Sequence, residues 1–138
     1  GYQRESDAST TREQIIATLR AAQSKAITGQ STSTWGVHFD TATADQHFFS
    51  LFHGASYAAG STSVETEKTP LLQRARLTNI DINGNTGGND IIFSRLTGLT
   101  SNYGTSTNSR AVCVSLNTDG TTCKLGVAVT AQGLINPL

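Results

Sequence analysis

The clearest pattern of hydrophobic and polar positions lies in residues 10–28, with the sequence TTREQIIATLRAAQSKAIT. Its apolar residues recur at spacings of four, three and four, at Ile15, Leu19, Ala22 and Ala26. This spacing places them on one face of an α-helix. Because the apolar stripe is narrow and rich in alanine, it suits a helix that lies close against a sheet. The pattern therefore predicts an N-terminal helix followed by a β-rich body.

The two ends of this helix are indicated by different signals. Thr10 and Glu13 have the spacing of a capping box, which makes Thr10 a candidate N-cap. The alternative is that the segment is the remainder of a longer helix, which then begins within residues 4–7. Gly29 suits the C-terminal cap. We therefore expect the helix over roughly residues 5–28.

Downstream, apolar and polar residues alternate in WGVHFD, residues 35–40, as in a half-buried strand. Residues 46–52, QHFFSLF, predict a second strand that forms a hairpin with the first. Further strands are expected at residues 75–82, 90–96, 110–116 and 122–130, and surface loops at residues 54–68 and 98–109. The sequence thus predicts one α+β domain over residues 1–138, with the helix packed on an antiparallel β-sheet formed by residues 35–138.

Composition narrows the class of protein. Ten Lys and Arg balance ten Asp and Glu, and only 14% of the 138 residues are charged. A surface of Ser, Thr, Asn and Gly suits an extracellular or periplasmic protein, and the balanced charge lacks the basic excess that nucleic-acid binding usually needs. No stretch approaches the ~20 apolar residues of a membrane span, and no signal peptide is visible. The chain starts at Gly1 without Met, which we interpret as the cut end of a longer helix.

Two cysteines, Cys113 and Cys123, flank the sequence Asn117-Thr-Asp-Gly120, a strong turn signal. A turn centred on Thr118 would place the cysteines opposite each other across a hairpin. A disulfide there would close a loop of about ten residues and contribute about 2–3 kcal/mol. The composition of an exported protein favours this bridge over the alternative, two free thiols in a β core.

Four segments carry a family resemblance. They are LRAAQSKAI at residues 19–27 leading into WGVHF at residues 35–39, FFSLF at residues 48–52, DIIFSRLTG at residues 90–98, and LGVAVTAQG at residues 125–133. In this order and spacing they resemble type IV pilin-like proteins, and most of all the minor pilins and pseudopilins of the FimT/GspH type. The likeness spans nearly the whole chain.

The resemblance implies a type IV pilin-like fold and a role in filament assembly. Members of the family are made as prepilins, with a leader and a hydrophobic half-helix whose N-terminus is methylated. That half-helix anchors the protein in the inner membrane and later packs in the filament core. It is absent here, so we expect a soluble domain from which it has been removed. The localisation implied is membrane-anchored before assembly, then an extracellular or periplasmic filament with other pilin subunits as partners.

Catalysis has no recognisable motif in the sequence. There is no G-x-S-x-G segment and no Gly-rich phosphate loop. The histidines His38, His47 and His53 are spread over one predicted hairpin and its exit, without metal-ligand spacing. We therefore expect neither an enzyme nor a resident cofactor.

Calcium is the one cofactor that the sequence leaves open. Asp81, Asn83 and Asn85 alternate as the oxygen ligands of a calcium loop do, and Asp90 is a further candidate ligand. The sixth and twelfth positions of that loop pattern are Thr86 and Ile92 instead of Gly and Glu. The alternative is a Gly- and Asn-rich connection between strands.

DNA binding is a second open possibility. Some FimT-like minor pilins act in DNA uptake, and the resemblance points to a C-terminal arginine motif after the closing glycine. Here Gly133 is followed by Leu134-Ile-Asn136, without arginine. Arg74 and Arg76 share one strand face and are candidate phosphate contacts. The net charge of zero argues against a broad electrostatic footprint.

These observations predict a non-enzymatic structural subunit, major or minor, of a type IV pilus-like filament that assembles through its N-terminal helix. The loops at residues 54–68 and 98–109 are expected to carry subunit contacts or adhesion. The alternatives are a DNA-binding or adhesive minor pilin in DNA uptake or attachment, and a pseudopilin of a type II secretion system. The expected cysteine-bridged hairpin favours a pilus over the secretion system.

Overall fold

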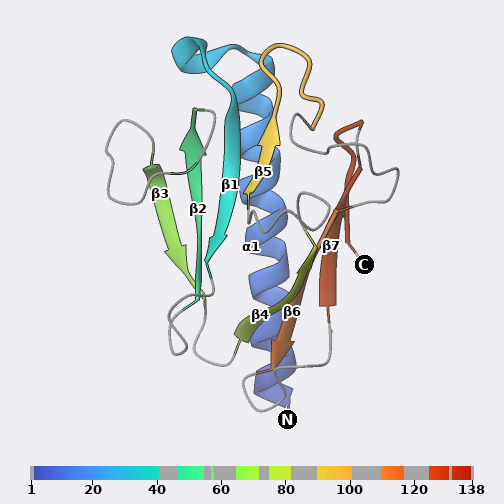
Figure 1. Ribbon diagram of the computed structural model, residues 1–138. Helices are drawn as coiled ribbons and strands as arrows, with labels where there is room; N and C mark the ends of the chain where they lie inside the picture. The colour runs from blue at the N-terminus through green and yellow to red at the C-terminus, as the bar shows by residue number, and fades with distance from the viewer. Residues whose placement is uncertain are drawn as a thin grey trace.

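The computed structural model describes residues 2–40, 47–54, 57, 65–71, 75–81, 90–100, 110–116, 125–130 and 132–137. A long helix, α1, runs along two antiparallel sheets of four strands each (Figure 1). In chain order the elements are α1 (Tyr2–Ile27), the 3₁₀ turn η1 (Gln30–Thr32), β1 (Trp35–Asp40), β2 (Phe48–His53), β3 (Glu65–Pro70), β4 (Ala75–Asp81), β5 (Asp90–Phe93), β6 (Arg110–Leu116), β7 (Leu125–Val129) and β8 (Ile135–Pro137). The predicted fold class is confirmed, but the β body divides into two sheets.

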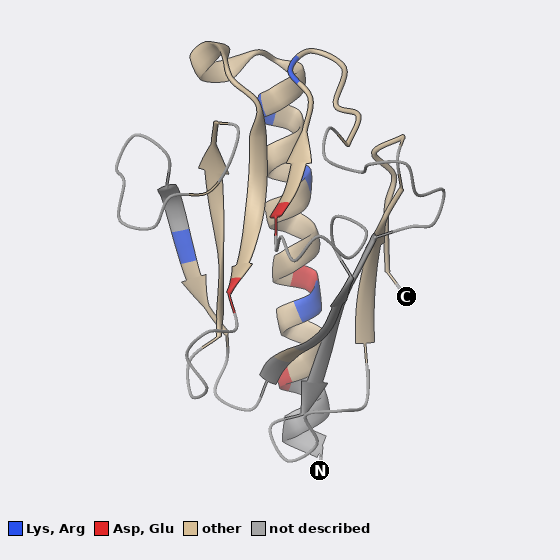
Figure 2. Cartoon of the chain, in the orientation of Figure 1, with Lys and Arg blue, Asp and Glu red and all other residues tan. Residues whose placement is uncertain are grey.

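Helix α1 begins earlier than a capping box at Thr10 would allow. It starts at Tyr2, so Thr10 lies inside the helix and the N-cap interpretation is wrong. The C-terminal signal is confirmed: the helix ends at Ile27, and Gly29 follows with a left-handed φ of 73°. Figure 2 shows that the described charges are sorted along the helix, with Asp7 and Glu13 in its first half and Arg20 and Lys25 in its second. This order complements the helix dipole.

The predicted apolar stripe of α1 is buried between the two sheets. Ile15, Leu19, Ala22 and Ala26 are each 0% exposed. They join a core that contains Trp35, Val37, Phe39, Phe49, Leu51, Ile91 and Phe93 from the first sheet and Leu77, Val127, Val129 and Ile135 from the second. Small alanine side chains let the helix approach strands from both sheets. The helix is therefore the element that joins the two sheets.

The first sheet has the strand order β3-β2-β1-β5. The predicted hairpin is confirmed, since β1 pairs with β2 and Val37 lies opposite Leu51. Strand β3 occupies part of the predicted surface loop at residues 54–68, so that prediction is wrong from Glu65 onward. Its sequence, ETEKTP, has no apolar alternation, because an edge strand needs to bury little of its surface.

The second sheet has the strand order β4-β6-β7-β8. Its edge strand β8 is absent from the sequence-based expectation, because it is three residues long and ends at a proline. The predicted strand at residues 90–96 stops at Phe93, and residues 95–97 form a turn in which Leu96 has a φ of +72°. Within the described residues, no helix combines the length and the hydrophobicity that crossing a membrane requires.

The register of the second sheet bears on the expected disulfide. Cys113 lies in β6 and pairs with Thr78 of β4 and Gly126 of β7. This pairing differs from a turn centred on Thr118, which would set Cys113 opposite Cys123. Cys123 lies outside the described residues, so the disulfide stays a prediction.

Candidate functional site

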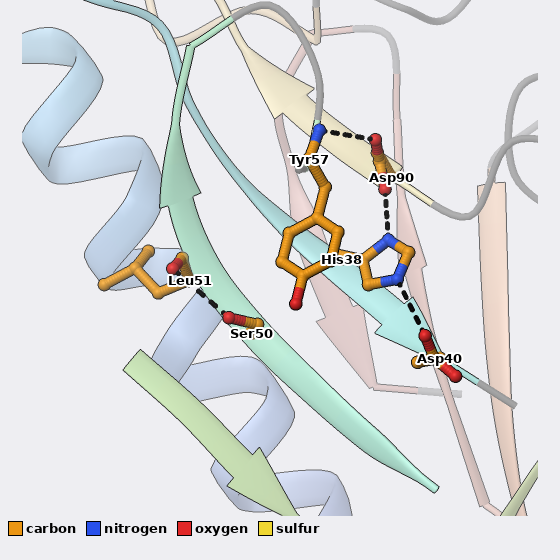
Figure 3. A network of polar contacts seen from close by, with 6 residues as sticks. All are labelled: His38, Asp40, Ser50, Leu51, Tyr57 and Asp90. Carbon is orange, nitrogen blue, oxygen red and sulfur yellow. Dashed lines mark hydrogen bonds and ion pairs between the residues drawn. The ribbon is translucent and has the colours of Figure 1, made fainter. Parts of the chain in front are cut away.

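A polar cluster on the first sheet has His38 at its centre (Figure 3). His38 comes from β1, Asp40 follows it in the same strand, and Asp90 begins the neighbouring strand β5. Nδ1 of His38 lies 2.6 Å from Oδ1 of Asp90, and Nε2 lies 3.3 Å from Oδ2 of Asp40. Because each ring nitrogen faces a carboxylate, a protonated His38 donates a hydrogen bond to both. Burial of the His38 side chain is substantial, with 16% of it exposed.

Tyr57 covers this histidine. The two rings are parallel within 1°, with centroids 3.9 Å apart. The backbone N–H of Tyr57 donates to Oδ2 of Asp90 at 3.4 Å, and its ring meets the edge of Phe52 in β2 at 5.8 Å. The cluster therefore links β1, β5 and the residue that lies between β2 and β3 in the chain.

The His38 cluster belongs to a row of paired positions that crosses the first sheet. The strand registers set Asp90 opposite His38, His38 opposite Ser50, and Ser50 opposite Lys68. Nζ of Lys68 lies 4.2 Å from the ring centroid of Phe48, which is itself in contact with the His38 ring at 6.1 Å. The sequence indicated that His38 and Asp40 share a face, but the pairing with Asp90 depends on the order of the strands.

The environment of His38 raises its pKa above the ordinary value of 6.5. Burial alone lowers the pKa, since it disfavours the charged imidazolium. The hydrogen bond to Asp90 and its negative charge outweigh this effect, and Asp40 adds a smaller contribution of each kind. General-base catalysis needs a ring nitrogen that can reach a substrate. With both nitrogens against carboxylates and one ring face under Tyr57, the cluster is arranged as an ion-paired structural link.

The raised pKa predicts that His38 stabilises the fold in a pH-dependent manner. The stabilisation is complete below the unfolded-state pKa near 6.5 and is lost as the pH rises through the folded-state pKa. Replacing His38 by glutamine should therefore cost about 1 kcal/mol more at about pH 6 than at about pH 9. Urea unfolding at both pH values measures the difference. His53→Gln is the control, and it should keep the wild-type pH dependence; an unchanged pH dependence in His38→Gln would contradict the assignment.

The other two histidines have separate structural partners. Nδ1 of His47 accepts a hydrogen bond from the N–H of Leu77 at 3.0 Å, which connects the entry of β2 to β4. His53 packs against the ring of Trp35, with centroids 5.1 Å apart. Among the described residues, no group of three or more His, Cys, Asp or Glu side chains could hold a metal ion.

The remaining predicted ligands lie largely beyond the described part of the chain. Of the calcium candidates, Asp90 pairs with His38 and Tyr57. Asn83 and Asn85 are outside the described residues, and of Asp81 the structure describes only the backbone in β4. Of the candidate DNA contacts, Arg74 is outside and only the backbone of Arg76 is described, opposite Ser115. Calcium and DNA binding therefore stay predictions.

A second site, which we call the helix-end junction, joins the C-terminal end of α1 to both sheets. Nε2 of Gln23 donates to the carbonyl oxygens of Gly98, at 3.0 Å, and of Gly133, at 2.7 Å. The hydroxyl of Thr100 donates to the carbonyl of Thr130 at 2.7 Å. One helix side chain thus holds the turn after β5 and the turn before β8. The sequence gave one weak signal for it, a polar residue beside the alanines of the buried stripe.

Comparison with known proteins followed from this geometry. A family model described as type II transport protein GspH matches residues 11–132, which include most of α1 and strands of both sheets. Among solved structures, the chain is similar to the minor pseudopilin EpsH from the Type 2 Secretion System of Vibrio cholerae. That match has 13% sequence identity and a TM-score of 0.59, and it covers 96% of each chain. No curated protein matches the chain.

Proposed function

Because the chain belongs to the GspH family of type II transport proteins, we propose that it is a minor pseudopilin, a structural subunit of the filament of a type II secretion system. The observation that carries the proposal is the family match over residues 11–132. The family description favours the secretion pseudopilus over the pilus that the cysteine hairpin suggested. The fold supports a structural role, since it resembles that of a minor pseudopilin over its whole length.

The uncovered face of α1 fits this role. Exposed residues recur along the helix at spacings of three and four, opposite the buried stripe, at Thr10, Glu13, Ala17, Arg20, Ser24 and Ile27. This spacing forms a continuous helical surface of small, polar and charged side chains. A helix of 26 residues is roughly 39 Å long. A rod held to the body on one side thus presents the other side to neighbouring subunits.

The remaining parts of the proposal follow from the family. We expect the full-length protein to be anchored in the inner membrane through a hydrophobic segment ahead of α1. On assembly it would join a periplasmic pseudopilus with other pseudopilin subunits as its partners. Its contribution is packing and not bond-making, in keeping with the ion-paired arrangement of His38.

The proposal predicts that deleting the gene stops or strongly reduces type II secretion in the native cell. Full-length wild-type protein restores secretion and co-purifies with the pseudopilus fraction. An Ala17→Lys variant, altered on the exposed helix face, should restore secretion only in part, because a long charged side chain obstructs close helix packing. The control Asn136→Lys, exposed in β8, should restore it fully. Normal secretion in the deletion strain, with the protein absent from the pseudopilus fraction, would refute the proposed function.

A further inference from the structure

The large apolar side chains that are exposed in the described part of the chain gather at one end of the molecule. They are Ile27, 46% exposed, Leu96, 58%, Leu99, 46%, and Leu134, 61%. Ile27 ends α1, Leu96 and Leu99 lie in the turn after β5, and Leu134 precedes β8. We call these four residues the apolar patch. Single exposed apolar residues are ordinary, but a gathered set marks an interaction surface.

The helix-end junction holds the patch together. The backbone N–H of Leu96 donates to the carbonyl of Ala26 at 2.8 Å, which fixes the turn beside Ile27. Gly98 lies so close to Ile27 that an added Cβ would come 2.7 Å from its Cδ1. The Thr100–Thr130 hydrogen bond and the backbone bond from Thr130 to the Leu134 carbonyl connect the remaining side. The four side chains therefore project from one fixed surface contributed by three segments.

Leu96 is doubly unfavourable for an isolated subunit. Its φ of +72° is in the left-handed region, which side chains with a Cβ rarely adopt. Its side chain is also more than half exposed. Strained backbone that presents an exposed apolar side chain is typical of a functional position, and here the simplest function is to contact another molecule.

Charge indicates what that molecule presents. The described charged residues nearest the patch are basic: Arg95 precedes Leu96, and Lys25 and Arg20 lie in the second half of α1 (Figure 2). The described acidic residues of the helix, Asp7 and Glu13, lie in its first half. One end of the subunit is thus apolar and basic, and the start of the helix is acidic. A partner that offers carboxylates on a helix complements the patch.

We propose that the apolar patch docks against the acidic first half of the helix of a neighbouring pseudopilin in the filament. This inference rests on the proposed function. A contact between two different faces of successive subunits is heterologous, and heterologous contacts generate open helical filaments. The patch supplies the apolar centre of the interface, and Arg95 and Lys25 supply its charged rim.

Site-specific photo-crosslinking in the native cell tests the inference. The full-length protein carries a benzophenone amino acid at Leu96 or at Leu134, and crosslinks are mapped by mass spectrometry in the pseudopilus fraction. The expected product joins either position to the first half of the helix of another pseudopilin. Pro70, exposed on the edge strand β3, is the control position and should not give this product. Crosslinks from the patch to any other segment or protein, or none in assembled filaments, would overturn the inference.

Charge introduction gives an independent measurement. The double variant Leu96→Asp, Leu134→Asp should reduce the amount of protein in the pseudopilus fraction by about fivefold or more. Aspartate tolerates the left-handed backbone at position 96, so the fold should be kept, and circular dichroism checks this. The matched control is Gln132→Asp with Asn136→Asp, both exposed outside the patch. If wild type and both double variants assemble equally, the inference fails and the proposed function stands; if wild type itself is absent from the filaments, both fail.

Discussion

Replacing Leu19 by alanine is expected to lower the free energy of unfolding by about 3 kcal/mol. Leu19 is 0% exposed and lies in the core cluster between the two sheets. No strand pairing among the described residues connects the two sheets, so α1 provides the packing that joins them. A cavity at this position is costly because each sheet is held by its own hydrogen bonds and collapses little into the space. Urea unfolding followed by circular dichroism measures the loss.

The control for this prediction is the next residue in the helix. Arg20 is exposed, and Arg20→Ala should change the free energy of unfolding by no more than about 0.5 kcal/mol. If Leu19→Ala does not fold, Leu19→Met keeps the volume and should cost less than about 1.5 kcal/mol. Equal effects of the two alanine substitutions would contradict the packing of α1 between the sheets.

The parts of the fold that sequence predicted are those with a local period. The stripe from Ile15 to Ala26 repeats every three or four residues, and the alternation in residues 35–40 repeats every two. Both patterns report burial on one side of a single element. The hairpin of β1 and β2 follows as well, because neighbouring strands joined by a short connection usually pair.

The parts that sequence missed depend on contacts between distant segments. Strand β5 pairs with β1, although β4 lies directly before it in the chain and belongs to the other sheet. This crossing brings Asp90 beside His38, where no spacing could indicate it. The edge strands β3 and β8 carry no apolar alternation, because solvent covers much of their surface.

The helix-end junction escaped prediction for a related reason. Gln23 contacts Gly98 and Gly133, residues that are 75 and 110 positions away in the chain. A glycine in a sequence signals a turn, but it does not tell which backbone will approach it. At Gly133 the structure supplies both reasons for glycine, a φ of +85° and a close approach by two other segments.

Replacing Gly133 by alanine is therefore expected to lower the free energy of unfolding by about 3 kcal/mol. An added Cβ would press against the carbonyl oxygen of Gly98 and lie 2.5 Å from Nε2 of Gln23. The Gly98 carbonyl is backbone and cannot rotate away, so the turn before β8 must move and both hydrogen bonds of Gln23 weaken. The positive φ adds strain to this clash. Urea unfolding of wild type and variant gives the difference.

Gly54 separates the clash from the strain. Its φ is +117°, yet an added Cβ there would meet nothing within 4 Å. Gly54→Ala should therefore cost about 1–2 kcal/mol, from backbone strain alone. A loss in Gly133→Ala no larger than the loss in Gly54→Ala would show that the close approach to Gly98 and Gln23 is not needed. A larger loss, accompanied by weaker incorporation into the pseudopilus, would tie the rigidity of the junction to the surface that the patch presents, because Leu134 follows Gly133 directly.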